Sequence, residues 1–266
     1  MSENSESNQK TKESPPIKRS TRIENVEIVP FDPLTPRLGR RESEPHSEEV
    51  SYLYEVLHLN FPGSRTTWDL HHYFIVESEE VDLQFDISFF KDLKIEYTLS
   101  SFRAANFNNR VPTMAINFLS KNKWQMDVGI HVDYCRLLKI PLYIVFSPYH
   151  IGKAIYKPPF LRAYILQPDG DYHIQDLNKI TLREGAASVQ RDALLNVGNI
   201  VPFKIGIMEL ISRHEGDLPR YRLILVNTQN YGIFPTLAQK EKSRADQEKS
   251  RADQLQKELD QYRRKV

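Results

Sequence analysis

One stretch of 33 residues, from Met114 to Phe146, does most to constrain the fold. It begins with a short apolar strand pattern, Met114–Leu119, and ends with Leu142–Phe146, in which every residue is apolar. A run without alternation is expected of a strand that is covered on both faces. Between the two strands, apolar residues recur at helical spacing. A strand, a helix and a strand in this order form a crossover unit, so part of the sheet should be parallel.

The residues around this unit indicate an α/β core. A helix is predicted from Ser47 to the Phe61-Pro62-Gly63 stop, because apolar residues recur there every three or four positions. The helix inside the crossover unit is expected to begin with Asp127 as its N-cap and to bury Ile130, Tyr134, Leu137 and Leu138. Further strands are predicted at Tyr73–Val76, Leu83–Phe90, Arg162–Leu166, Tyr172–Leu177 and Tyr221–Val226.

Composition divides the chain into three parts. Residues 1–45 are rich in Ser, Glu, Pro, Lys and Arg and hold six of the 16 prolines. Such a segment buries too little apolar surface to offset the entropy of ordering it. We therefore expect a disordered N-terminal tail over residues 1–45, a globular domain over residues 46–234 and a charged helix over residues 235–266.

The last part contains a repeat. Glu241–Gln247 reads EKSRADQ, and the same seven residues return at Glu248–Gln254. A seven-residue period is typical of coiled coils. One seam would hold Ala238, Ala245, Ala252 and Leu259, and the other Glu241, Glu248, Leu255 and Tyr262. Two glutamates weaken the second seam, so the pattern allows either a coiled coil near the C-terminal end, which would make a homo-oligomer, or a single exposed helix.

Composition also excludes several functional classes. No apolar run approaches the roughly 20 residues that cross a bilayer, and the first residues contain no hydrophobic signal segment, so we expect a cytoplasmic protein without membrane contact. The single cysteine, Cys135, is expected to be a small buried residue. His71 and His72 are adjacent and would face opposite sides of a strand, so they do not predict a metal site. The net charge of +1 means that any DNA contact should be local.

Several short patterns stand in an order that is informative when they are taken together. Phe85–Phe89 reads FDISF, and residues 223–254 are a strand pattern followed by a helix rich in Lys, Arg, Glu and Gln. Between them stands the frame Pro112, Leu119, Ser120, Asp127, Gly129, Ile140 and Tyr143. From about Ser47 to its end, the chain thus resembles the Uma-type restriction endonucleases of the PD-(D/E)xK nuclease superfamily. The resemblance implies a restriction-endonuclease-like fold, a mixed sheet flanked by helices.

In that family, carboxylates hold one or two Mg²⁺ ions for phosphodiester hydrolysis, and a lysine adds positive charge near the phosphate. The resemblance places Asp86 at a retained carboxylate. It places Thr113, Asn117 and His131 at the positions of an aspartate, a glutamate and the lysine. It therefore implies a degenerate catalytic site of Asp86, Thr113, Asn117 and His131. The residues able to contact a metal would be Asp86, Asn117 and Asp127.

The changed residues predict that cleavage is lost or severely weakened. Asn117 brings no negative charge, and a histidine such as His131 is mostly uncharged at neutral pH. Mg²⁺ gives up its waters reluctantly, so one matching carboxylate supports it poorly. Each residue also has a structural interpretation. Asn117 could bind a neighbouring loop, His131 could be a satisfied helix histidine, Asp127 could be an N-cap and Asp86 could face solvent.

Three functional hypotheses follow. In the first, the nuclease fold is retained with a degenerate metal site, and the protein acts by binding, with DNA as a candidate partner. In the second, it is an active Mg²⁺-dependent DNA endonuclease in which Asp86, Asn117 and another acid, Asp127 or Glu96, share the metal and His131 replaces the lysine. In the third, the terminal helix is a self-association or docking module that the globular domain carries.

Overall fold

The fold is that of a computed structural model, which describes residues 44–121, 123–151, 153–212 and 219–263. The predicted tail falls outside these residues except for Glu44 and Pro45, with which the first helix begins. This helix, α1 (Glu44–Asn60), confirms the helix predicted from Ser47 and starts three residues earlier. It ends just before Phe61-Pro62-Gly63, as the sequence indicates.

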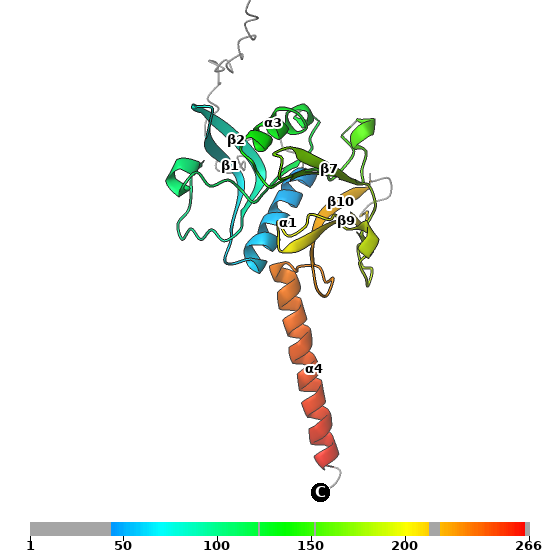
Figure 1. The fold of residues 1–266 in the computed structure, drawn as a ribbon. Helices are drawn as coiled ribbons and strands as arrows, with labels where there is room; N and C mark the ends of the chain where they lie inside the picture. The colour runs from blue at the N-terminus through cyan, green and yellow to red at the C-terminus, as the bar shows by residue number, and fades with distance from the viewer. Residues whose placement is uncertain (1–43, 122, 152, 213–218, 264–266) are drawn as a thin grey trace, which may run out of the picture. The chain divides into compact units, whose positions relative to one another are not determined.

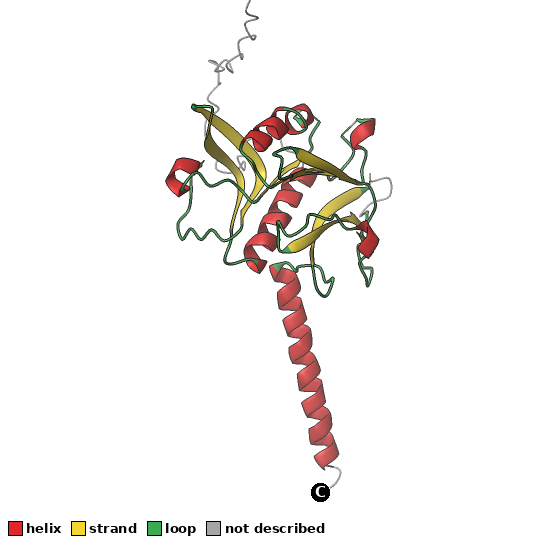
Figure 2. Cartoon of the chain, in the orientation of Figure 1, coloured by secondary structure: helices red, strands yellow, loops and turns green. Residues whose placement is uncertain are grey.

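A mixed sheet forms the larger part of the globular fold (Figures 1 and 2). It has seven strands in the order β3-β1-β2-β4-β5-β6-β7. Its neighbours are antiparallel except for the pairs β4–β5 and β1–β3, which are parallel. The strands are β1 (Arg65–Val76), β2 (Glu79–Phe90), β3 (Phe102–Arg103), β4 (Met114–Phe118), β5 (Leu142–Ser147), β6 (Phe160–Leu166) and β7 (Tyr172–Leu177). Short 3-10 helices lie at Ala104–Phe107, Ala154–Tyr156 and Arg191–Ala193.

The crossover unit between β4 and β5 has the predicted parallel pairing but a different helix. Two short helices, α2 (Trp124–Asp127) and α3 (Ile130–Leu137), join the strands. The N-cap prediction for Asp127 is wrong, because Asp127 ends α2 and Gly129 is the N-cap of α3. The predicted buried face is also partly wrong, since Ile130 and Leu137 are 49% and 47% exposed. Cys135 is the buried residue of α3, and it is fully buried as predicted.

A second sheet, of three strands, packs with α1 and the central sheet around one apolar core. Its order is β10-β9-β8, with β8 (Leu182–Arg183), β9 (Phe203–Leu210) and β10 (Arg220–Asn227). The strand predicted at Tyr221–Val226 is present as β10, but it belongs to this second sheet and not to a single α/β core, and β9 was not predicted. The prediction of one sheet is therefore wrong. Phe203, Ile205 and Ile207 of β9 do alternate with other residues, but Gly206 stands in the middle of the run, and glycine is a weak strand former.

The C-terminal helix α4 (Leu237–Arg263) runs for 27 residues, and none of them is buried (Figure 1). Its first turn is held by a capping box in which Gln239 N–H donates to the Thr236 hydroxyl and Gln239 Oε1 accepts from Thr236 N–H. Glu55 of α1 accepts the Leu237 N–H at 2.7 Å. None of the helices in the described parts of the chain is long and apolar enough to span a membrane.

Candidate functional site

A polar cluster forms where β2 and β4 separate. These strands pair only over Ile87–Phe89 of β2. At Asp86, just before Ile87, side chains accept the backbone hydrogen bonds that strand pairing would otherwise satisfy. Asp86 N–H donates to Asn117 Oδ1 at 3.2 Å, and Phe118 N–H donates to Asp86 Oδ2 at 2.6 Å. Each of the two polar side chains therefore satisfies a backbone N–H of the neighbouring strand, which fixes the orientation of both.

Asn117 uses both of its amide donors and one acceptor position of its oxygen inside this cluster. Its oxygen faces the Asp86 N–H, an obligatory donor, so its nitrogen must point the other way. There Nδ2 donates to Asp127 Oδ1 at 2.7 Å and lies 3.0 Å from His131 Nδ1. Because Nδ2 can only donate, His131 Nδ1 is the acceptor and the ring proton lies on Nε2. Asn117 is only 3% exposed, so water does not compete for these partners.

Two histidine–aspartate contacts flank the amide. His131 Nδ1 lies 3.4 Å from Asp127 Oδ1 on one side, and His46 Nε2 lies 3.2 Å from Asp86 Oδ1 on the other. His46 belongs to the first turn of α1 and is 6% exposed. Sequence reasoning missed it, because it lies 40 positions before Asp86 and outside every recognised pattern. Only the packing of α1 beside β4, where His46 meets the Phe118 ring edge-on, brings it to the cluster.

Asp127 makes hydrogen bonds through both its side chain and its backbone. Its carboxylate binds Asn117, and its backbone carbonyl accepts the Tyr143 hydroxyl at 2.8 Å. Tyr143 lies on β5 and is fully buried, and this burial raises the pKa of its hydroxyl well above the ordinary value. Tyr143 therefore remains a neutral donor. Asp127 and Tyr143 were both part of the sequence pattern behind the family resemblance, but no contact between them was predicted. In the structure, this hydrogen bond links them.

Two predicted residues do not join the cluster. Thr113 precedes β4, four positions from Asn117 and so about 13 Å along an extended chain, and its hydroxyl accepts the Lys91 N–H at 3.0 Å. Glu96 is 80% exposed at its side chain and pairs with Lys94. The two adjacent histidines also lie elsewhere. His71 contacts Asp82 at the surface, whereas His72 is buried among aromatic rings, and burial lowers the pKa of His72 to about 4.

The cluster as arranged does not fit a magnesium ion. Mg²⁺ needs oxygen ligands with near-octahedral geometry. Here Asp86 Oδ2 and Asn117 Oδ1 accept backbone N–H groups, and Asp127 Oδ1 accepts the Asn117 amide. No group of three or more His, Cys, Asp and Glu side chains that could hold a metal occurs among the described residues. Three of the oxygens that a metal would use, one each from Asp86, Asn117 and Asp127, are thus already engaged by protein donors.

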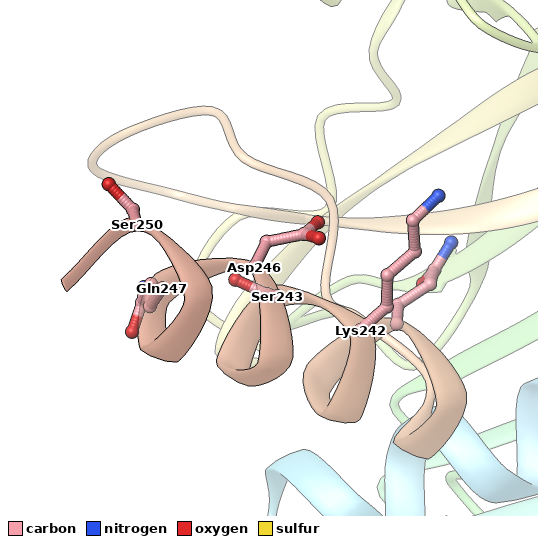
Figure 3. Close-up of a pocket in the computed structure, with 6 residues that line it drawn as sticks. Lys242, Ser243, Asp246, Gln247 and Ser250 are labelled. Atoms are coloured by element: carbon pink, nitrogen blue, oxygen red, sulfur yellow. The ribbon is translucent and has the colours of Figure 1, made fainter. Parts of the chain in front are cut away.

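A separate concavity of about 420 Å³ lies on α4 (Figure 3). It is lined by Gln239, Lys242, Ser243, Asp246, Gln247 and Ser250, all from this one helix. Ligand pockets bury most of a small molecule's surface between converging elements. One face of a solvated helix cannot do this, so the concavity is not a candidate site.

Comparison with known proteins finds no matching family model and no matching curated protein. One solved structure that aligns with the chain is from Anabaena variabilis and is described as a "putative nuclease belonging to DUF820". The aligned residues are 16% identical and cover 57% of this chain and 75% of that chain, with a TM-score of 0.39. The function is therefore inferred from the residues of the polar cluster and from their order along the chain.

Proposed function

We propose that this chain is a nuclease-like protein of the Uma type that cleaves phosphodiester bonds weakly or not at all and acts by binding nucleic acid. The proposal rests on one observation above all. The side chain that matches the family's glutamate is an amide, and it donates a hydrogen bond to Asp127. The order of elements that the resemblance implies, with Asp86 on β2, Asn117 on β4 and His131 on α3 before β5, supports the assignment.

The amide explains why cleavage should be weak. In a two-carboxylate metal site, the cation offsets the repulsion between the acids and lowers the pKa of an attacking water. Here Asn117 Nδ2 donates to Asp127, and Phe118 N–H donates to Asp86. Hydrogen-bond donors of the protein thus stabilise both carboxylates without a metal. A cation that took these two oxygens would compete with the buried bonds, and each broken bond leaves an unsatisfied buried group.

The first prediction concerns metal affinity and cleavage. Isothermal calorimetry of the full chain with MgCl₂ and MnCl₂ should show no saturable binding at sub-millimolar metal, and plasmid DNA should not be nicked. The double variant Asn117→Glu/His131→Lys adds a third carboxylate beside Asp86 and Asp127 and should gain metal binding. Thr113→Asp adds the same charge about 13 Å away along the strand and is the matched control, which should gain none.

The contrary results are equally specific. Magnesium-dependent nicking by the unmodified chain that disappears in Asp86→Ala would establish the active endonuclease of the second hypothesis. If Thr113→Asp gained as much metal affinity as the Asn117 variant, the site would lie elsewhere. Unfolding curves for each variant show whether the fold is retained, because the added Glu replaces a buried amide that satisfies the Asp86 N–H.

A second candidate function, self-association through α4, is favoured by a specific surface. Leu255, Leu259 and Tyr262 are 57%, 44% and 68% exposed and follow one another at spacings of four and three residues. They therefore form one apolar stripe along the helix. Residues 237–263 carry seven basic and six acidic side chains, so their charge does not favour a polyanion. A second copy of the chain, with the same balanced pattern, is the partner that fits.

A further inference from the structure

Away from the polar cluster, two cations lie close to one aromatic ring. The Arg191 guanidinium lies 4.1 Å and the Lys204 ammonium 4.6 Å from the centre of the Tyr231 ring, so the two charges are no more than 8.7 Å apart, the sum of these distances. The three residues come from different elements: a 3-10 helix, β9 and the turn after β10. We call this set the Tyr231 cluster.

The Tyr231 cluster presents several hydrogen-bond donors. Lys204 Nζ donates to the Tyr231 hydroxyl oxygen at 3.1 Å, since an ammonium group can only donate. The hydroxyl proton of Tyr231 is therefore left to donate outward. This hydrogen bond and the charge of Lys204 lower the pKa of Tyr231, which makes its hydroxyl a stronger donor. Arg191 adds a planar fork of N–H groups, the geometry that matches phosphate.

The turn that carries Tyr231 is organised before any ligand binds. Asn227 Oδ1 accepts the N–H groups of Gln229 and Asn230, and Asn227 O accepts the Tyr231 N–H at 3.1 Å. Tyr231 itself has a positive φ of 60°, a conformation that non-glycine residues rarely adopt. The ring is thus held in place by its own turn, and the cations are placed around it. A ligand would not have to order this loop.

Within the part of the chain that the structure describes, neither cation has an acidic partner. Among the described residues, no carboxylate oxygen lies within 4.0 Å of Arg191 or Lys204. A contrasting arrangement exists on the other sheet, where Arg103 lies 4.2 Å from the Tyr73 ring but also binds Glu80 at 2.8 Å. The Arg103 charge is neutralised within the protein, and the charges of the Tyr231 cluster are not.

We propose that Arg191, Lys204 and Tyr231 form a phosphate-contacting surface that binds the backbone of nucleic acid. This inference rests on the proposed function, and it adds a contact that is built from other elements than the polar cluster around Asn117. Backbone contacts are made by Arg, Lys and Tyr side chains and carry no sequence information. The surface would hold the strand without reading its bases. A local surface of this kind also agrees with a chain whose net charge is only +1.

The test is the salt dependence of binding to a short fluorescein-labelled DNA duplex, measured by anisotropy with the full chain. Each phosphate contact contributes about one unit to the slope of log K against log salt. Arg191→Gln/Lys204→Gln should therefore lower the slope by about two units and weaken binding. Tyr231→Phe keeps the ring and removes the donor, so it should weaken binding and leave the slope unchanged. The matched control Arg103→Gln/Arg183→Gln removes two cations that already pair with Glu80 and Glu209 and should change neither quantity.

The outcomes separate this inference from the proposed function. If the duplex binds but the Arg191/Lys204 variant keeps the original affinity and slope, the surface is wrong and the binding function stands. If the duplex does not bind and a labelled polyglutamate peptide binds through the same residues, the partner is an acidic protein, and both the nucleic-acid assignment and the binding function fail. Binding of neither probe overturns both. Equal urea midpoints for the four proteins show that lost binding is not lost folding.

Discussion

The polar cluster depends on one nitrogen atom. Asn117 Nδ2 reaches both Asp127 and His131, whereas a glutamate at this position would place a second negative oxygen against Asp127. The backbone N–H of Asp86 fixes which end of the amide points to which partner. With an amide at position 117, Asp86 and Asp127 both accept hydrogen bonds from protein donors.

A buried glutamate outside the polar cluster should make the stability of the fold depend on pH. Glu49 is 1% exposed and contacts Arg222 at 2.9 Å. Burial raises the pKa of Glu49 from 4.5 to about 7, and Arg222 offsets only part of this effect. The folded protein therefore binds this proton more tightly than the unfolded chain. The resulting stabilisation is complete below pH 4.5 and is lost as the pH rises through about 7.

Glu49→Gln should remove this dependence. Between pH 4.5 and about 7, the free energy of unfolding of the variant should rise relative to that of the unmodified protein, by at most about 3 kcal/mol. Urea denaturation at a series of pH values measures it. Glu48→Gln, which breaks the neighbouring Glu48–Arg220 ion pair at a more exposed position, is the control. Parallel stability curves for Glu49→Gln and the unmodified protein would show that Glu49 does not titrate in this range.

Among the elements, the second sheet depends on a close approach that only glycine permits. A Cβ at Gly206 of β9 would lie 2.5 Å from Thr181 Oγ1. Thr181 cannot easily move, because its buried hydroxyl donates to Ala193 O at 2.5 Å and accepts the Ile207 N–H at 2.9 Å. This contact ties the segment before β8 to β9.

Gly206→Ala should therefore destabilise the protein by about 1 to 3 kcal/mol, the usual cost of overpacking. Gly63→Ala is the matched control, because nothing lies within 4 Å of a Cβ at that position. Its effect should stay within about 0.5 kcal/mol. Thermal or urea unfolding measures both variants. Equal stability of the two would mean that Thr181 has room to shift.

For the whole molecule, the proposal to test is that two copies associate through α4. The helix is anchored to α1 through Glu55 and through Asn60, which donates to Pro235 O at 3.0 Å. Its apolar stripe is short, so association through it alone should be weak. Standard interfaces bury about 800 Å² on each partner, far more than three side chains supply.

Light scattering across a concentration series should detect this association in the full chain. Leu255→Ser/Leu259→Ser should abolish any dimer, because it removes two of the three stripe residues. Leu237→Ser changes an exposed leucine of the same helix outside the stripe and should leave the mass unchanged. A mass that stays monomeric at every concentration, or a dimer that survives the double substitution, would exclude the stripe as the interface.

The sequence alone determined those features that depend on periodicity and composition. Helix α1, the parallel pair β4–β5 and the burial of Cys135 were predicted from their apolar residues, and the terminal helix was predicted from its charged seven-residue repeat. The convergence of Asp86, Asn117, Asp127 and His131 was expected from their order along the chain. Thr113 was grouped with them because positions on one strand face look alike in sequence, whatever the distance between them.

Only the tertiary structure decided the rest. Contacts between residues far apart in the chain bring His46 to Asp86 and pack a second sheet against α1. They also give the carboxylate of Asp127 its hydrogen bond from Asn117. Local patterns carry no signal for such contacts. The same applies to Tyr231, whose ring meets Arg191 and Lys204 because a 3-10 helix, the start of β9 and the turn after β10 come together. Periodicity determines which residues are buried, whereas packing determines which polar groups meet.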